Sequence, residues 1–164
     1  MAASPQAGAA EQMKTLFLGA HPDDVEFGCA GYILTDRNIE ALYVVFTQCL
    51  NHEHNRNIIS EYETVTKKLA IPHIMLNLPN QHLSSLDFKI RHLLELYRSE
   101  FHPDVIFCPS LSDPHQDHRA IPQEAVRVFR KETILFYELP VFNPDFNPRY
   151  FHPITAQDAK RKVR

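Results

Sequence analysis

Short runs of apolar residues alternate with longer amphipathic segments along most of this chain. The apolar runs are continuous and contain many β-branched and aromatic residues, which is typical of parallel strands that are buried on both faces. They predict five strands, at residues 14–19, 41–47, 73–78, 104–108 and 133–138. The segments between them carry apolar residues at helical spacing. Helices are therefore expected at residues 25–37, 57–70, 86–101 and 117–130, with a further helix starting near Thr155.

This alternation of strands and helices predicts an α/β fold with a mostly parallel sheet of about five strands and helices on both faces. Two details refine the helices. Thr155 and Asp158 form a capping-box pattern, and Pro122 is expected in or near the first turn of the fourth helix. No repeat or linker divides the chain, so we expect one domain over residues 13–164. The Ala-rich, polar residues 1–12 are expected to be a disordered leader.

The composition excludes several classes of protein. The chain has 164 residues, of which 44% are hydrophobic and 23% are charged, as in ordinary globular domains. A net charge of -3 argues against a nucleic-acid partner, and no apolar run reaches the roughly 20 residues that a membrane-spanning helix needs. Cys29, Cys49 and Cys108 have apolar neighbours and no Cys-x-x-Cys spacing. They are expected to be buried free thiols, which favours a cytoplasmic location.

Polar, metal-competent side chains follow the first and the fourth expected strands. His21 and Asp24 come three residues apart after the first strand, and His118 follows the fourth. Because neighbouring parallel strands open into one crevice at their carboxyl ends, the three side chains meet if these two strands are adjacent. Histidine and aspartate are zinc ligands, and Fe²⁺ would suit the same set. We therefore expect a site for zinc or another divalent metal.

Three further residues of the two clusters carry candidate catalytic roles. Asp23 can accept a proton from a water on the metal, His115 can donate a hydrogen bond to a developing oxyanion, and Asp117 can orient an imidazole. The set matches metal-assisted hydrolysis of an amide. A structural alternative stays open, in which His21 and Pro22 form a turn while Asp23 and Asp24 cap a helix.

The two clusters also resemble the signatures of a known family. The segment Ala20-His21-Pro22-Asp23-Asp24-Val25-Glu26-Phe27-Gly28, and the later His115-Gln116-Asp117-His118, are similar to the motifs of the LmbE-like / PIG-L-like zinc deacetylases. The resemblance implies a Rossmann-like fold and removal of the acetyl group from N-acetylglucosamine units joined to lipid, thiol-precursor or antibiotic scaffolds. It also implies that zinc is held by His21, Asp24 and His118. Asp23 is then the general base, with His115 polarising or protonating the tetrahedral intermediate and Asp117 assisting.

The substrate side of the site departs from the family pattern. The loop at residues 48–56 has no glycine, although relatives usually have a Gly-rich loop that leads to a substrate-binding arginine. Arg56 is the counterpart in this chain, and relatives usually continue beyond its C-terminal end. Arg119 is expected either to hold a substrate phosphate, to neutralise Asp117 or to form a surface ion pair. Asp113 is expected either to touch substrate or to cap the turn at Pro114.

Two other features have open interpretations. His52 and His54 either form a second metal site or belong to a solvated lip of the active site. Glu26 either holds His21 or His118 in place or is a solvated residue of the first helical turn. The expected partner is a small-molecule amino-sugar conjugate, and a homo-oligomer is possible. The alternative function is a metal- or sugar-binding remnant, or a subunit that needs a partner to complete its pocket.

Overall fold

A single five-stranded sheet forms the centre of the computed structural model, which describes residues 11–36, 38–50, 55–140, 143 and 146–162. All neighbouring strands pair in parallel, in the order β3-β2-β1-β4-β5. The strands are β1 (Met13–Gly19), β2 (Ile39–Thr47), β3 (His73–Leu78), β4 (Val105–Pro109) and β5 (Thr133–Tyr137). The predicted α/β fold is confirmed, and each predicted strand lies within two residues of its observed limits.

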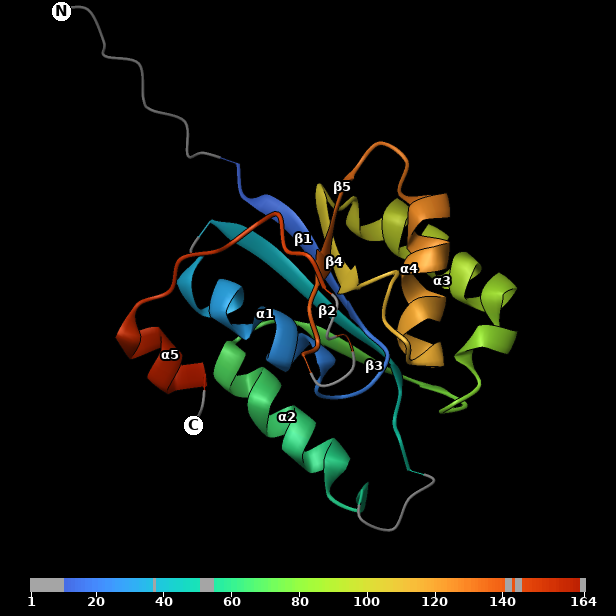
Figure 1. Ribbon diagram of the computed structural model, residues 1–164, viewed down its shortest axis with the longest axis horizontal. Coiled ribbons are helices and arrows are strands. Elements are labelled where there is room, and N and C mark those ends of the chain that lie inside the picture. The colour runs from blue at the N-terminus through green and yellow to red at the C-terminus, as the bar shows by residue number, and fades with distance from the viewer. Residues whose placement is uncertain (1–10, 37, 51–54, 141–142, 144–145, 163–164) are drawn as a thin grey trace, which may run out of the picture.

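Helices cover both faces of the sheet (Figure 1). Helices α1 and α2 lie on one face, and α3 and α4 lie on the other. A short 3-10 helix, η2 (Leu83–Ser85), precedes α3, and α5 packs against α1. The helices are α1 (Asp24–Thr35), α2 (Ile58–Leu69), α3 (Asp87–Phe101), α4 (Gln116–Val128) and α5 (Ala156–Lys162).

The central strand β1 separates two apolar cores. Successive side chains of a strand point to opposite faces of the sheet. Leu16 and Leu18 accordingly pack into the core under α3 and α4, whereas Phe17 packs into the core under α1 and α2. All three are fully buried. This explains why the first apolar run is continuous, since a central strand of a two-layered α/β sheet has no solvent face.

The strand order reverses between β1 and β4. The chain passes from β1 outward to β2 and β3, and then returns to place β4 on the other side of β1 and β5 beyond it. The carboxyl ends of β1 and β4 are therefore neighbours at a topological switch point, where open α/β sheets bind ligands. The adjacency on which the sequence argument depended is confirmed, with Leu16 of β1 paired to Ile106 of β4.

Local features agree with the sequence in most places. The backbone N–H of Asp158 donates to Thr155 Oγ1 at 3.2 Å, so the predicted cap of α5 forms. All three cysteines are free and buried. Pro122 was wrongly placed near the first turn, because it lies in the middle of α4, where it is buried. A proline there leaves the His118 carbonyl without its usual helical donor.

None of the helices in the described parts of the chain combines the length and the apolar character that crossing a membrane requires. Residues 1–10 of the expected leader lie outside the described residues, and so do His52 and His54 of the loop after β2.

Candidate metal centre

The side chains of the two sequence clusters converge at the carboxyl ends of β1 and β4. Asp24 is the first residue of α1, which begins five residues after β1 ends, and His118 is the third residue of α4. His21 lies in the turn between β1 and α1. The short connections after both strands bring the two helix starts together, and with them the residues that sequence spacing alone left far apart.

The carboxylate of Asp24 is held by the turn that precedes it. Its Oδ2 accepts hydrogen bonds from the backbone N–H groups of Ala20 at 2.8 Å and His21 at 2.9 Å. The side chain is almost fully buried, yet its other oxygen, Oδ1, lies 3.2 Å from His118 Nε2. Burial opposes the charged carboxylate, but the imidazoles of His118 and His21 hold the pKa of Asp24 well below its usual range. Asp24 is thus a fixed anion in the site.

Neither aspartate of the first motif acts as a side-chain helix cap. Asp23 occupies the N-cap position of α1, but its carboxylate makes no capping hydrogen bond. The Asp24 carboxylate is turned back onto the preceding turn. The structural alternative raised from the sequence, in which both carboxylates cap the helix, is therefore not what the structure contains.

Potential ligand atoms of three residues lie at distances that suit a divalent metal. His21 Nδ1 and His118 Nε2 are 3.1 Å apart, His118 Nε2 and Asp24 Oδ1 are 3.2 Å apart, and His21 Nδ1 and Asp24 Oδ2 are 3.7 Å apart. Zinc bonds of about 2.0–2.1 Å in a tetrahedron separate neighbouring ligand atoms by about 3.4 Å. The donor set and its spacing therefore fit zinc, and the same atoms suit Fe²⁺.

Electrostatics at this point favour positive charge. Burial disfavours protonated imidazoles, but the carboxylates of Asp117 and Asp24 raise the pKa of His21 to about 10. The carboxylates of Asp24 and Asp113 likewise raise the pKa of His118 despite its burial. A bound cation would replace protons on these imidazoles, because metal ligands must be deprotonated.

Asp113 holds His118 from behind. Its Oδ2 lies 2.9 Å from His118 Nδ1, and its Oδ1 accepts the backbone N–H of His115 at 2.8 Å. A carboxylate on one ring nitrogen directs the other nitrogen toward a metal. Asp113 is buried, with 1% of its surface exposed, so the structure favours the turn-capping alternative over direct contact with substrate. Its bond to His118 had no signal in the sequence beyond the spacing of five residues.

His115 lies beside the cluster of His21, Asp24 and His118, and its ring can donate a hydrogen bond from Nε2. Its Nδ1 accepts the backbone N–H of Asp117 at 3.2 Å, so the neutral ring carries its proton on Nε2. His21, His115 and His118 could form a three-imidazole site, since one nitrogen of each lies within 4.8 Å of the others. A protonated Nε2 cannot ligate a metal, which favours Asp24 as the third ligand. Burial and the neighbouring imidazolium charges lower the pKa of His115.

Asp117 connects the site to the chain that follows β3. This fully buried carboxylate accepts the backbone N–H of Gln81 at 2.6 Å and of Leu83 at 3.0 Å, and its Oδ2 lies 3.4 Å from His21 Nε2. Burial opposes its charge, but these hydrogen bonds lower its pKa. Asp117 can therefore orient His21, as expected from the sequence. The two backbone amides were missed, because main-chain donors leave no mark in a sequence.

Asp23 is the carboxylate that the ligand cluster does not use. Its side chain is exposed at the N-terminus of α1. Desolvation by the surrounding atoms and the neighbouring Asp24 carboxylate raise the pKa of Asp23, while the imidazoles of His21 and His118 act in the opposite direction. A raised pKa makes a carboxylate a stronger base, so the position and the environment of Asp23 suit proton transfer.

The expected substrate residues lie on the surface. Arg56 is exposed shortly before α2, and Arg119 is exposed on α4. Asp117 is stabilised by Gln81, Leu83 and His21, so Arg119 is not needed to neutralise it. Within the described residues, Arg119 makes no ion pair.

Glu26 behaves as neither of the two alternatives raised from the sequence. Its Oε2 accepts a hydrogen bond from the Tyr43 hydroxyl at 2.7 Å. In the described part of the chain, Glu26 forms no hydrogen bond or ion pair with His21 or His118. Burial raises the pKa of Glu26 to about 7, although the bond from Tyr43 acts against this shift. The contact joins α1 to β2.

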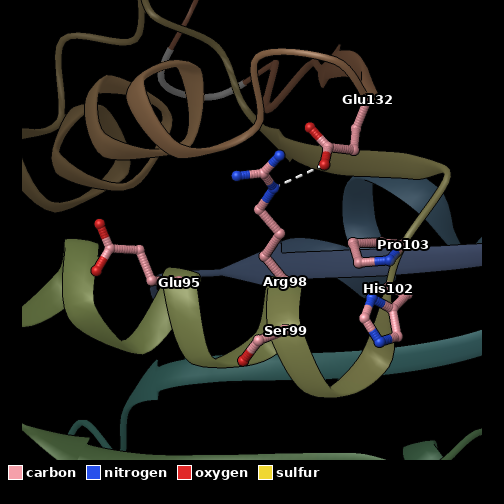
Figure 2. A pocket seen from close by; sticks show the side chains of 6 residues that line it. All are labelled: Glu95, Arg98, Ser99, His102, Pro103 and Glu132. Carbon is pink, nitrogen blue, oxygen red and sulfur yellow. Dashed lines mark hydrogen bonds and ion pairs between the residues drawn. The ribbon is translucent and has the colours of Figure 1, made fainter.

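A different cavity lies at the opposite end of the strands from the candidate metal centre, next to the amino ends of β4 and β5 (Figure 2). It has a volume of about 380 Å³, and its lining comes from the end of α3 and from Glu132. Figure 2 shows Arg98 reaching across it to Glu132, with Nε and Oε1 2.7 Å apart. This ion pair connects α3 to the segment before β5. The lining residues do not form a cluster of ligand atoms like that of the candidate metal centre.

A family model and a relative of this chain both match over most of its length. The family model PIG-L, described as GlcNAc-PI de-N-acetylase, matches residues 16–129, which include both clusters. The uncharacterized deacetylase YaiS of Escherichia coli (strain K12) is 28% identical over 160 residues, covering 87% of this chain and 82% of the relative.

Solved structures share the fold. N,N'-diacetylchitobiose deacetylase from Pyrococcus horikoshii has a TM-score of 0.73 at 22% identity, covering 92% of this chain and 67% of that chain. The zinc-inhibited form of teicoplanin deacetylase Orf2 has a TM-score of 0.73 at 9% identity, covering 92% of this chain and 81% of that chain. At these identities the likeness concerns the fold.

Proposed function

Because this chain belongs to the PIG-L family of de-N-acetylases, we propose that it is a metal-dependent hydrolase that removes an N-acetyl group from an amino-sugar conjugate. The observation that carries the proposal is the convergence of three side chains, in which His118 Nε2 lies 3.1 Å from His21 Nδ1 and 3.2 Å from Asp24 Oδ1. A family match alone would leave the chemistry to analogy, whereas this cluster supplies ligand atoms at metal-binding distances.

The proposed metal ligands are His21, Asp24 and His118. When bound there, zinc or another divalent metal supplies Lewis-acid activation of an acyl oxygen and lowers the pKa of water. Asp113 and Asp117 keep His118 and His21 in the orientation that the ligand role needs. Both carboxylates already bind backbone amides, which restricts their motion.

Asp23 is proposed to be the general base. It accepts a proton from the attacking water, and its raised pKa is the environment that such a base requires. His115 donates its Nε2 proton as a hydrogen bond to the oxygen that becomes negative as the amide carbon turns tetrahedral. Asp23 then gives the proton that it took from the water to the leaving amine, which departs as the C–N bond breaks and acetate forms.

The proposed substrate is a small amino-sugar conjugate. The supporting names are those of the relatives, which describe deacetylation of GlcNAc-PI, N,N'-diacetylchitobiose and teicoplanin compounds. Exposed Arg56 and Arg119 are the proposed contacts to the polar part of the conjugate. The names of these proteins all describe removal of an acetyl group and differ in the compound that carries it, so the N-acetyl group is the feature that we carry over.

The test joins metal content to acetate release. Wild-type protein loaded with zinc should release acetate from N-acetylglucosamine conjugates, and Asp23→Asn should retain the metal while kcat falls by about 100-fold or more. Asp87→Asn, in the exposed first turn of α3, is the matched control and should leave both quantities unchanged.

Two results would contradict the proposal in different ways. Full activity of zinc-loaded Asp23→Asn would remove Asp23 from the base role. Stoichiometric metal without turnover on lipid-, thiol- and antibiotic-linked amino sugars would favour the alternative, a binding remnant or a partner-dependent subunit.

A further inference from the structure

A second cavity lies where α1, α2 and α5 meet, away from the candidate metal centre. Figure 1 shows these three helices together on one face of the sheet. The cavity has a volume of about 410 Å³, which is within the range of small-molecule sites. Apolar side chains of α1 and α2 form part of its lining, namely Ala30, Leu34, Val65 and Leu69.

Two buried polar atoms at this junction have no hydrogen-bond partner among the described residues. They are Glu26 Oε1 and the hydroxyl of Tyr62. Glu26 lines the cavity, and its other oxygen is occupied by the Tyr43 hydroxyl at 2.7 Å. The rings of Tyr43 and Tyr62 are 5.3 Å apart, so Tyr62 lies beside the tyrosine that binds Glu26. Buried polar groups of native proteins are nearly always paired, so these two atoms indicate a missing partner.

The remaining lining is cationic. Lys68 of α2 and Arg161 and Lys162 of α5 contribute to the same cavity as Glu26. Lys162 is held there because its Nζ donates to the Phe27 carbonyl at 2.7 Å, and Arg161 is held by Asp158 at 3.3 Å. The cavity therefore combines one buried acceptor with a cluster of three positive charges.

A ligand that satisfies both parts must carry two kinds of charge. A buried carboxylate oxygen is best matched by an ammonium group, because a charged donor compensates the cost of removing the carboxylate from water. Lysine and arginine side chains are common partners of phosphate. We propose that this cavity is a second ligand site, which binds a small molecule carrying both an ammonium group and a phosphate. The proposal does not depend on the reaction at the metal centre.

Three matched probes test the charge requirement on the full chain. O-phosphoethanolamine carries both groups, ethyl phosphate lacks the ammonium group, and ethanolamine lacks the phosphate. Calorimetric titration should show O-phosphoethanolamine binding about tenfold or more tightly than either partial probe, because each charged hydrogen bond contributes at least that factor. In methyl NMR spectra, the signals of Val65 and Leu69 should shift on its addition.

Variants locate the binding. Val65→Phe fills the cavity and should weaken binding of O-phosphoethanolamine about tenfold or more. Val126→Phe, at an exposed position of α4, is the matched control and should bind as the wild type does. Should Val65→Phe fail to fold, Lys68→Gln tests the same site, and it should reduce the affinity for O-phosphoethanolamine to about that of ethanolamine.

The ammonium and phosphate could come from a free metabolite or from a lipid headgroup. Cosedimentation with phosphatidylethanolamine vesicles, but not with phosphatidylcholine vesicles, would identify a headgroup, whereas binding of the free compound alone would identify a metabolite. Equal affinities for the three probes, or shifts confined to residues around His21 and His118, would overturn the proposal and leave ordered water as the partner of Glu26 and Tyr62.

Discussion

Two buried aspartates hold the imidazoles of the candidate metal centre from behind. Asp113 binds His118 through Oδ2 and one backbone amide through Oδ1. Asp117 binds a backbone amide through each oxygen, and its Oδ2 also lies beside His21 Nε2. A carboxylate with four acceptor positions can serve both partners, whereas an amide side chain offers one oxygen and one donor group. Replacing the carboxylate by an amide therefore tests whether it supports the metal-binding histidine.

Asp113→Asn should lower metal affinity by about 10- to 100-fold. The asparagine oxygen can accept from His115 N–H or from His118 Nδ1–H but not from both, and its amide group would then face a donor. Competition with a chromophoric chelator measures the affinity. Asp87→Asn serves as the control, and an unchanged affinity in Asp113→Asn would show that His118 needs no such support.

The proposed metal ligands could be predicted from the sequence, whereas the hydrogen bonds that hold them in place could not. His21 and Asp24 are three residues apart, and His118 joins them once β1 and β4 are neighbours, which the alternation of strands and helices suggested. Asp113 was left undecided, because its role depends on the path of the turn at Pro114. The amides of Gln81 and Leu83 were invisible, since any residue type supplies a backbone N–H.

At the scale of elements, a close contact between α1 and β5 fixes the position of the first cluster. Gly28 of α1 packs against the ring of Tyr137 so closely that an added Cβ would lie 2.7 Å from Tyr137 Cγ. The ring cannot easily turn away, because its hydroxyl donates to the Leu18 carbonyl at 2.8 Å. The glycine of the sequence motif thus sets how deeply α1, which carries Asp24 at its first turn, approaches the sheet.

Gly28→Ala should destabilise the protein by about 1–3 kcal/mol through overpacking, and it should reduce acetate release because α1 moves. Urea unfolding measures the first effect. Gly31→Ala is the control on the same helix, where the added Cβ meets Ile154 Cγ2 at 3.1 Å. Ile154 is 43% exposed and can shift, so its effect should be smaller. Equal unfolding free energies for wild type and Gly28→Ala would contradict this account.

The end of α2 offers a stabilising substitution. Ala70 caps this helix in the left-handed region, with φ of 56° and ψ of 40°. A residue with a Cβ is strained there, whereas glycine adopts the conformation freely. Because Ala70 is exposed, Ala70→Gly should raise the free energy of unfolding by about 0.5–1 kcal/mol.

Ala120→Gly, at a buried position inside α4, is the comparison for Ala70→Gly. It should lower the free energy of unfolding by about 1 kcal/mol, because glycine disfavours a regular helix. Urea unfolding of both variants checks the opposite signs. A loss of stability in Ala70→Gly would mean that the cap is not strained in solution.

The positions of the helices and strands were easier to predict than the details within them. Runs rich in apolar residues located all five strands, and the run is continuous in central strands such as β4, which is buried along its whole length. Pro122 was misplaced because a proline usually marks a helix start, and only packing in the folded chain shows that α4 continues through it. Local preference gave way there to tertiary context.

Across the whole molecule, the two ends of the sheet have different roles. The carboxyl ends of β1 and β4 carry the charged ligand cluster, whereas the amino ends of β4 and β5 are joined to α3 by the Arg98–Glu132 ion pair (Figure 2). Substitutions at the amino ends should therefore change stability without changing catalysis. For the ion pair, the direction in which stability changes with pH follows from the pKa of Glu132.

Glu132→Gln should lower the free energy of unfolding at pH 7 by up to about 1 kcal/mol and leave acetate release unchanged. Burial alone would raise the pKa of Glu132, but Arg98 and backbone N–H groups lower it below its ordinary 4.5. The ionised form therefore stabilises the fold above pH 4.5, and this contribution disappears as the pH falls through the lower folded-state pKa. Urea unfolding across this pH range should show wild type and variant converging on the acid side. Glu95→Gln, from the same cavity lining, is the control, and its free energy of unfolding should equal that of the wild type at every pH. If the free energies of Glu132→Gln and wild type differed by the same amount at every pH, the ionised carboxylate would not be the source of the stability.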